Sequence, residues 1–133
     1  MGMSRVLSFA YDSSYDPPAP FILISVDGYI SGRSPVTVPA FADSGADGTM
    51  LPQDILTAVE AEYEDTVLLR GTAGGVQKLD RYTVRIRTEE KTIDSVSAVA
   101  TAAGSEPLIG RDVLNHLVVT LNGSAGYTEV QVE

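Results

Sequence analysis

The sequence predicts an all-β domain with one or two short helices, and three observations support this fold class. The chain has 133 residues, 44% of them hydrophobic, which is enough for a single compact core. Valine and threonine recur in segments where apolar and polar residues alternate, as in half-buried strands. Glycines and prolines interrupt these segments at short intervals, as turns between strands require.

The clearest strand covers residues 82–88, where Tyr82, Val84 and Ile86 face one way and polar residues face the other. Weaker patterns of the same kind predict strands at residues 21–26, 35–41, 66–69, 93–101, 117–121 and 127–132. One short helix is expected to open at Pro52, since proline suits a first helical position, and another to run from about residue 111 to 117.

Residues 16–20 carry three prolines and cannot pair as a central strand. We therefore expect one domain over residues 1–133 with three parts. Residues 1–20 form an N-terminal arm and linker, residues 21–122 form the core, and residues 123–133 form a C-terminal strand extension.

Composition excludes several classes of function. The chain has no cysteine and one histidine, which rules out thiolate metal sites and most zinc sites, so no cofactor is expected. The formal charge of −9 and the lack of a basic cluster disfavour binding to nucleic acid or an anionic membrane surface. No stretch could span a bilayer or serve as a secretory signal, so a cytoplasmic location is expected. Catalysis would have to use carboxylates, hydroxyls or backbone groups.

The first candidate site is the turn after an expected apolar strand, where residues 41–49 read FADSGADGT. Asp43 would present a carboxylate at the end of a rigid element, and the hydroxyl of Ser44 can donate and accept hydrogen bonds. Gly45 would allow a tight turn or a close backbone approach. The same three residues are also typical of an ordinary turn at a strand end, so by themselves they do not distinguish a catalytic site from such a turn.

Two further segments change that balance. Residues 69–76, LRGTAGGV, place three glycines at the tip of an expected hairpin that could open and close over a cleft. Residues 107–114, PLIGRDVL, form an apolar strand that ends in glycine just before a short helix. Each segment also has an ordinary interpretation, as a hairpin turn or as a strand-to-helix junction.

Together and in this order, the three segments resemble the retroviral-type aspartic proteases, the retropepsins, over residues 21–122, and a bacterial-type member would suit the composition. The resemblance implies a retropepsin-like closed β-barrel that acts as a symmetric homodimer. It implies that Asp43 is the catalytic carboxylate, that Ser44 locks the two catalytic loops together, and that Gly45 is the turn of the motif. It further implies substrate-binding positions at Ala46, Asp47, Gly71, Thr72, Ala73, Gly74 and Gly75, and dimer-bracing positions at Asp47, Gly110 and Arg111.

The activity that this resemblance implies is an aspartic endopeptidase acting on polypeptides. Peptide hydrolysis needs a base to activate water and an acid to protonate the leaving nitrogen. The chain has one Asp-Ser-Gly motif, so two copies of Asp43 on a two-fold axis would share one proton and supply both groups. The expected partners are a second copy of the chain and a polypeptide substrate, with no nucleic acid and no membrane.

The chain departs from the viral pattern in several places. An insertion around residues 29–34 lengthens an early hairpin, an arm precedes Pro17, and residues 123–133 extend the chain beyond the viral end. In viral members the termini build the dimer sheet, so the interface could be assembled differently here. Ala73 is smaller than the branched residue usual at the flap centre, which would loosen flap closure. Ala46 cannot donate the hydrogen bond that a hydroxyl residue would offer.

Three alternatives stay open. The strongest is a catalytically silent member of the same fold that serves as a dimerisation or peptide-binding module. A serine hydrolase using Ser44, His116 and an aspartate is less well supported, because Ala42 breaks the G-x-S-x-G pattern. Calcium binding by Asp43 and Asp47 is weaker still, because the alternating carboxylates of an EF-hand loop are absent.

Overall fold

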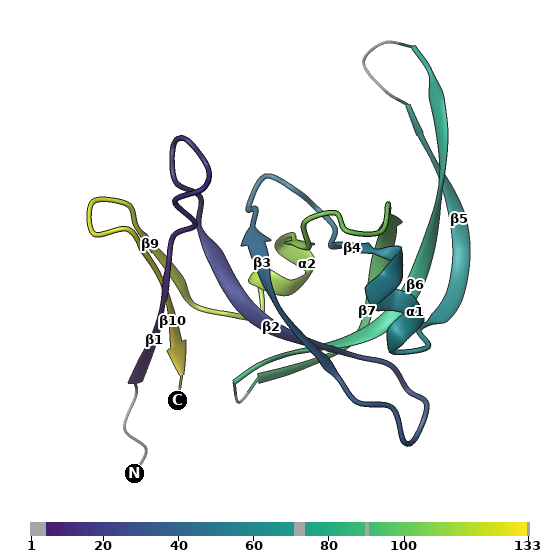
Figure 1. Cartoon of the computed structure of the whole chain (residues 1–133), viewed down its shortest axis with the longest axis horizontal. Coiled ribbons are helices and arrows are strands. Elements are labelled where there is room, and N and C mark those ends of the chain that lie inside the picture. The colour runs from purple at the N-terminus through teal and green to yellow at the C-terminus, as the bar shows by residue number, and fades with distance from the viewer. Residues whose placement is uncertain (1–4, 71–73, 90, 133) are drawn as a thin grey trace.

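The computed structural model describes residues 5–70, 74–89 and 91–132. Figure 1 shows a curved β body with a long hairpin projecting from one end and the two chain termini close together at the other. In chain order the elements are β1 (Arg5–Ala10), β2 (Phe21–Asp27), β3 (Val36–Ala42), β4 (Met50–Pro52), α1 (Gln53–Ala58), β5 (Glu62–Arg70), β6 (Val76–Thr88), β7 (Lys91–Thr101), β8 (Leu108–Ile109), α2 (Arg111–Leu114), β9 (Val119–Asn122) and β10 (Tyr127–Val132).

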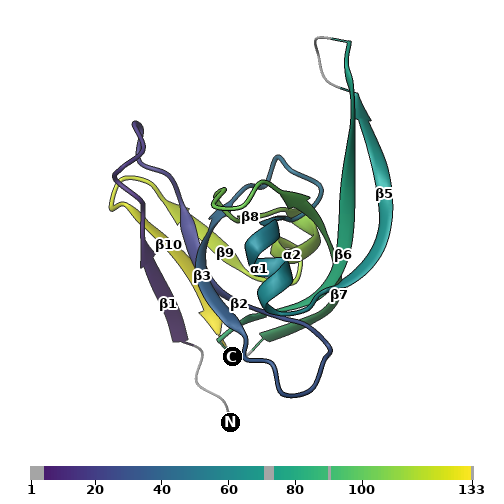
Figure 2. The same ribbon diagram turned by 45° about the vertical axis from the view of Figure 1, so that its right-hand side comes forward.

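The body is a seven-stranded sheet with the order β2-β3-β8-β4-β7-β6-β5, and β2 also pairs with β6. Most neighbours are antiparallel, but β3 pairs in parallel with β8, and β4 in parallel with β7. Figure 2 shows α1 and α2 lying within the curve of this sheet. The parallel pair of β3 and β8 matters for the site, because it brings a segment that is distant in sequence alongside β3.

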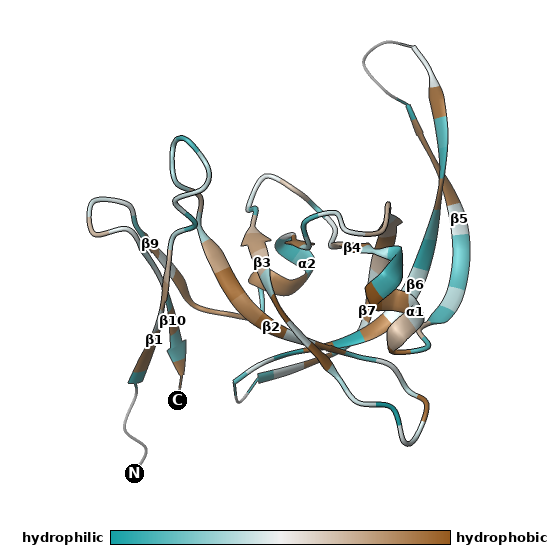
Figure 3. Cartoon of the chain, in the orientation of Figure 1, coloured by the Kyte–Doolittle hydropathy of each residue, from teal (hydrophilic) through white to brown (hydrophobic). Residues whose placement is uncertain are grey.

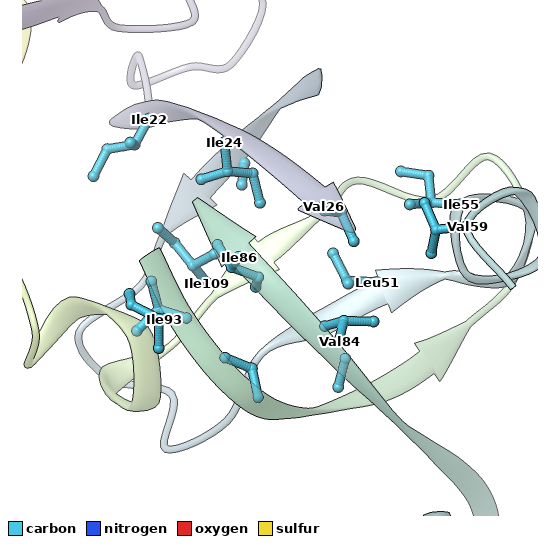
Figure 4. Close-up of a cluster of buried hydrophobic side chains, with 14 of the residues drawn as sticks. Ile22, Ile24, Val26, Leu51, Ile55, Val59, Val84, Ile86, Ile93 and Ile109 are labelled. Carbon is cyan, nitrogen blue, oxygen red and sulfur yellow. The ribbon is translucent and has the colours of Figure 1, made fainter. Parts of the chain in front are cut away.

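Alternation along the strands builds the core, as the sequence pattern predicts. Val84 and Ile86 on β6 are fully buried, whereas Arg87, the next residue along the strand, is exposed. Figure 4 shows these side chains meeting residues from β2, β4, β7, β8 and α1 in one cluster. Its largest fully buried members include Ile22, Ile24, Leu51, Leu56, Ile86 and Ile109. Figure 3 shows the same division, with hydrophobic residues concentrated on β2, β3 and β7 and a mixture along β5 and β6.

A second, three-stranded sheet has the order β1-β10-β9. It joins the N-terminal arm to the C-terminal extension, with Arg5 opposite Val132 and Ala10 opposite Tyr127. The sequence analysis missed β1, because most of its residues are exposed and its pairing partner lies at the far end of the chain.

Several predicted boundaries need correction. Pro52 ends β4 and precedes α1, so it is not the first helical residue, and α2 ends at Leu114 instead of residue 117. The structure extends β5 back to Glu62 and begins β6 at Val76, because pairing within the long hairpin outweighs its polar composition. The three residues of β4 were too few to predict.

The β-rich part of the fold prediction is confirmed, whereas the closed barrel and the homodimer stay predictions. In the described part of the chain, no helix is both long and apolar enough to cross a membrane.

Candidate active site

Asp43 lies directly after β3, at the point where a buried strand leaves the core. Ala40 and Ala42 on β3 are buried, and Asp43 is half-buried. The backbone N–H of Asp43 donates to the carbonyl oxygen of Ile109 at 3.0 Å, which extends the parallel pairing of β3 with β8 by one residue. The predicted catalytic carboxylate is therefore carried by a backbone that is hydrogen-bonded to β8.

The turn that follows is organised by the Asp43 side chain itself. Its Oδ1 accepts a hydrogen bond from the N–H of Gly45 at 2.9 Å, and its backbone carbonyl accepts one from Ala46 at 3.2 Å. A Cβ atom added at Gly45 would lie 3.2 Å from Oδ1 of Asp43. Glycine is thus favoured here by a close approach to the carboxylate, whereas the neighbouring Ser44 is exposed.

The segment around α2 braces this turn from the other side. The backbone N–H of Arg111 donates to the carbonyl of Ala46 at 2.8 Å, and its guanidinium Nη1 donates to the carbonyl of Ser44 at 2.8 Å. A Cβ at Gly110 would lie 2.6 Å from the carbonyl oxygen of Gly48, so only glycine fits without movement. The structure thus brings together two segments that the sequence analysis singled out separately.

Asp47, the remaining predicted residue of this loop, is exposed. Among the residues that the structure describes, no ion pair links Asp47 to Arg111. The guanidinium contacts the Ser44 carbonyl within the chain instead, and the bracing role across a dimer stays a prediction.

Sequence reasoning missed a clamp at the far end of the loop. Thr49 is fully buried, and its Oγ1 donates to Oδ1 of Asp112 at 2.8 Å while its backbone N–H donates to Oδ2 at 3.1 Å. The Thr49 Oγ1 also accepts a longer contact from the N–H of Gly110 at 3.4 Å. A polar residue between Gly48 and an apolar strand was a possible signal, but Asp112 stood out in the sequence only as part of the segment at residues 107–114. Its partner lies 63 residues earlier in the chain.

The predicted flap is the hairpin formed by β5 and β6, which extends away from the body in both Figure 1 and Figure 2. Gly71, Thr72 and Ala73 lie outside the described residues. Gly74 has a φ of +84°, a conformation that favours glycine, and Gly75 leads into β6.

The base of this hairpin is held by charged and polar side chains. Arg81 donates to both carboxylate oxygens of Asp65, from Nε at 2.7 Å and from Nη2 at 2.5 Å. Beside it, Oε1 of Glu64 accepts hydrogen bonds from Thr83 at 2.9 Å and from Ser97 at 2.8 Å. The hydrogen bonds from Arg81 lower the pKa of Asp65 from its usual value. These contacts fix the hairpin at its base.

The competing chemistries find little support in this geometry. His116 lines a cavity against the terminal sheet with Leu7 and Val130, and no hydrogen bond joins it to Ser44 in the described chain. Within the same residues, no group of three histidine, aspartate or glutamate side chains is placed to hold a metal ion.

Comparisons with known proteins identify the family and the fold of the chain. The family model described as retroviral aspartyl protease matches residues 17–122. No curated protein matches the chain by sequence. Among solved structures, a retropepsin-like aspartic protease from Rickettsia conorii superposes with a TM-score of 0.64 at 11% identity, over 97% of this chain and 92% of that one. EIAV protease, in complex with the inhibitor HBY-793, gives a TM-score of 0.51 at 18% identity, over 74% of this chain and 86% of that one. The two structures support the fold, and the family match shows that this chain belongs to the retroviral aspartyl protease family.

Proposed function

We propose that the chain is an aspartic endopeptidase whose active site forms when two copies bring their Asp43 carboxylates together. The observation that carries this proposal is the loop geometry. Asp43 is fixed at the end of β3 by Ile109, its carboxylate accepts from Gly45, and Arg111 holds the following residues. Membership of an aspartic protease family supports the same chemistry.

One chain provides half of the required chemistry, because it has a single Asp-Ser-Gly motif. In the dimer, one Asp43 is ionised and the other carries the shared proton. The ionised carboxylate takes a proton from water, whose oxygen attacks the peptide carbonyl carbon, and the protonated carboxyl gives its proton to the carbonyl oxygen. When the tetrahedral intermediate collapses, the carboxyl that took the proton from water gives it to the leaving nitrogen, a hydroxyl of the intermediate returns a proton to the other carboxylate, and the C–N bond breaks.

The terminal sheet suggests how the two copies meet. β1 pairs with β10 of the same chain, so the N-terminal strand is already used internally. β9 is the opposite edge of that sheet, and Leu121 on it is 54% exposed. Unpaired edge strands readily pair with another chain. In the proposed dimer, β9 therefore pairs with β9 of the second copy, which joins two three-stranded sheets about the two-fold axis.

The β5–β6 hairpin provides the cover for an extended peptide. Leu68, Leu69 and Val76 near its outer end are 63%, 44% and 59% exposed, which is an unusual density of apolar side chains for a hairpin in water. In the proposed complex they contact the substrate, whose backbone pairs with the enzyme while alternate side chains enter apolar pockets. We therefore expect apolar residues at the cleaved bond.

The decisive experiment compares wild type with Asp43→Asn on an unbiased peptide library, from about pH 3 to about pH 8, with and without a hydroxyl-containing transition-state mimic. Asp54→Asn is the matched control, because it removes a similar charge from α1. Cleavage by wild type and the control, abolished by Asp43→Asn and by the inhibitor, is the expected result. Dimers that bind peptides without cutting them would instead favour the silent module. Activity should rise faster than linearly with enzyme concentration while the dimer is partly dissociated.

A further inference from the structure

A loop of the N-terminal arm is tied to the body near the candidate site. Asp12 and Ala19 exchange backbone hydrogen bonds at 2.8 and 3.2 Å, which closes the loop between them. From this loop, the Tyr15 hydroxyl donates to Oε2 of Glu106 at 2.9 Å. Glu106 lies two residues before β8, the strand that holds the backbone of Asp43.

Aromatic contacts extend the same connection towards the catalytic loop. The ring centroids of Tyr15 and Phe21 lie 5.8 Å apart, and those of Phe21 and Phe41 lie 5.7 Å apart in an edge-to-face arrangement. Phe41 lies two residues before Asp43 on β3. The loop therefore packs against the sheet surface that ends at the proposed catalytic carboxylate.

The contact with Tyr15 places Glu106 on that surface. Ala42 and Ile109 are paired and buried in the core, so Phe41 and its partner Leu108 face the opposite side. The N–H of Phe41 donates to the carbonyl of Pro107 at 2.8 Å, so the chain just before β8 stays beside β3. Glu106 lies two residues before Leu108, and its hydrogen bond with Tyr15, whose ring packs against Phe21, puts it on the side that Phe41 faces.

The charge of Glu106 is not neutralised by a cation. In the described chain the side chain is exposed, its hydrogen-bond donor is the neutral hydroxyl of Tyr15, and it joins no ion pair. The hydrogen bond with Glu106 raises the pKa of Tyr15 above its ordinary value, as expected beside a carboxylate.

We propose that Glu106, positioned by Tyr15, selects a basic side chain at a position of the substrate that flanks the cleaved bond. This specificity rests on the proposed function, since it assumes that a peptide lies across the surface beside Asp43. Two-fold symmetry gives one such carboxylate on each side of the cleaved bond. The preference for a cation is distinct from the apolar preference expected at the bond itself.

The test uses peptides that cannot be cut, in which a hydroxyl-bearing unit replaces the scissile amide. Each flanking position carries Lys, Gln or Glu in turn, and the affinity of each peptide is measured by calorimetry. Wild type is expected to bind the Lys peptide roughly tenfold more tightly than the Glu peptide at one flanking position. The Glu106→Gln variant should remove this ratio, and Glu106→Lys should reverse it. Affinity for the Gln peptide should stay constant and serves as the control for folding.

Two further variants separate position from charge. Tyr15→Phe keeps the ring contact with Phe21 but removes the donor to Glu106, so it should reduce the Lys-to-Glu ratio without changing affinity for the Gln peptide. Glu89→Gln removes the same charge from an exposed ion pair with Arg5 and should leave the ratio unchanged.

The outcomes distinguish this proposal from the endopeptidase proposal. Equal affinity for all three peptides, or a ratio that survives Glu106→Gln, would show that Glu106 does not select the side chain, even if the enzyme cuts peptides. A charge-dependent affinity that Glu106→Gln abolishes, in a protein that cuts nothing, would support the selection while excluding the endopeptidase. Failure of every peptide to bind would overturn both.

Discussion

Replacing Gly110 by alanine should damage the candidate site more than any other change of one methyl group. The added Cβ would lie 2.6 Å from the Gly48 carbonyl oxygen and 2.8 Å from that of Ala46. Neither neighbour is the flexible end of a side chain, so the catalytic loop or α2 must move. Overpacking of this kind costs about 1–3 kcal/mol. The movement also weakens the two hydrogen bonds from Arg111, each worth about 0.5–1.5 kcal/mol.

The expected loss is therefore about 2–4 kcal/mol of the free energy of unfolding, which lowers the urea midpoint by roughly 1–2 M. Peptidase activity per folded molecule should fall more than about tenfold, because displacement of the loop moves Asp43. Urea unfolding at fixed protein concentration measures the first effect, and initial rates at a temperature where the variant is folded measure the second.

Two other glycines supply matched controls. Gly48 lies in the same loop, but an added Cβ would meet nothing within 4 Å, so Gly48→Ala should change stability by less than about 0.5 kcal/mol. A Cβ at Gly28 would overlap the carbonyl oxygen of Val59, far along the sheet, so Gly28→Ala should destabilise the fold while leaving activity per folded molecule intact. If Gly110→Ala keeps wild-type stability, or loses activity only as Gly28→Ala does, the brace is not what positions Asp43.

Three more predictions concern the loop and the hairpin. Thr49→Val leaves the Asp112 carboxylate without its hydroxyl donor and should cost about 1–3 kcal/mol in urea unfolding, whereas an unchanged midpoint would mean that water replaces the hydroxyl. Because Arg81 lowers the pKa of Asp65 in the folded state, their pairing stabilises the fold above the unfolded pKa of about 3.9 and this contribution is lost as pH falls through the lower folded value. The thermal midpoint of Asp65→Asn should therefore approach that of wild type as pH falls from about 6 to about 2, and a constant gap between them would contradict the linkage. Ala46→Ser adds a hydroxyl that can donate to the catalytic carboxylates, so the acid limb of activity should move to lower pH, and an unmoved profile would show that the hydroxyl points elsewhere.

The sequence predicted most of the body, because burial imposes a period of two on its strands. Ile22, Ile24 and Val26 on β2, and Val84 and Ile86 on β6, follow the alternation that identified those strands. The sequence did not predict strands whose stability comes from pairing with a neighbouring strand and not from burial of their own side chains. The exposed residues of β1 carry little periodic signal, and the polar residues at the start of β5 form a strand because β6 lies beside them.

The same distinction holds for the candidate site. Asp43, Gly45 and Arg111 were singled out because each belongs to a short motif with a local chemical meaning. The pair of Thr49 and Asp112 was missed because neither residue is unusual until the fold places them together. Tyr15 and Glu106 are separated by 91 residues, and nothing near either one in the sequence indicates a partner.

The loop that carries Asp43 depends on the second half of the chain for its shape. Ile109, Arg111 and Asp112 each hold a different part of it, and all three lie within four consecutive residues at the junction of β8 and α2. The chain that leaves this junction forms β9, the edge strand at which the second copy is proposed to pair. A shift of α2 would therefore move both the loop and the proposed dimer edge, because only four residues, 115–118, separate α2 from β9. Dimerisation and the placement of Asp43 would then be coupled through one short segment, so changes confined to β9 should alter activity per dimer as well as dimer affinity.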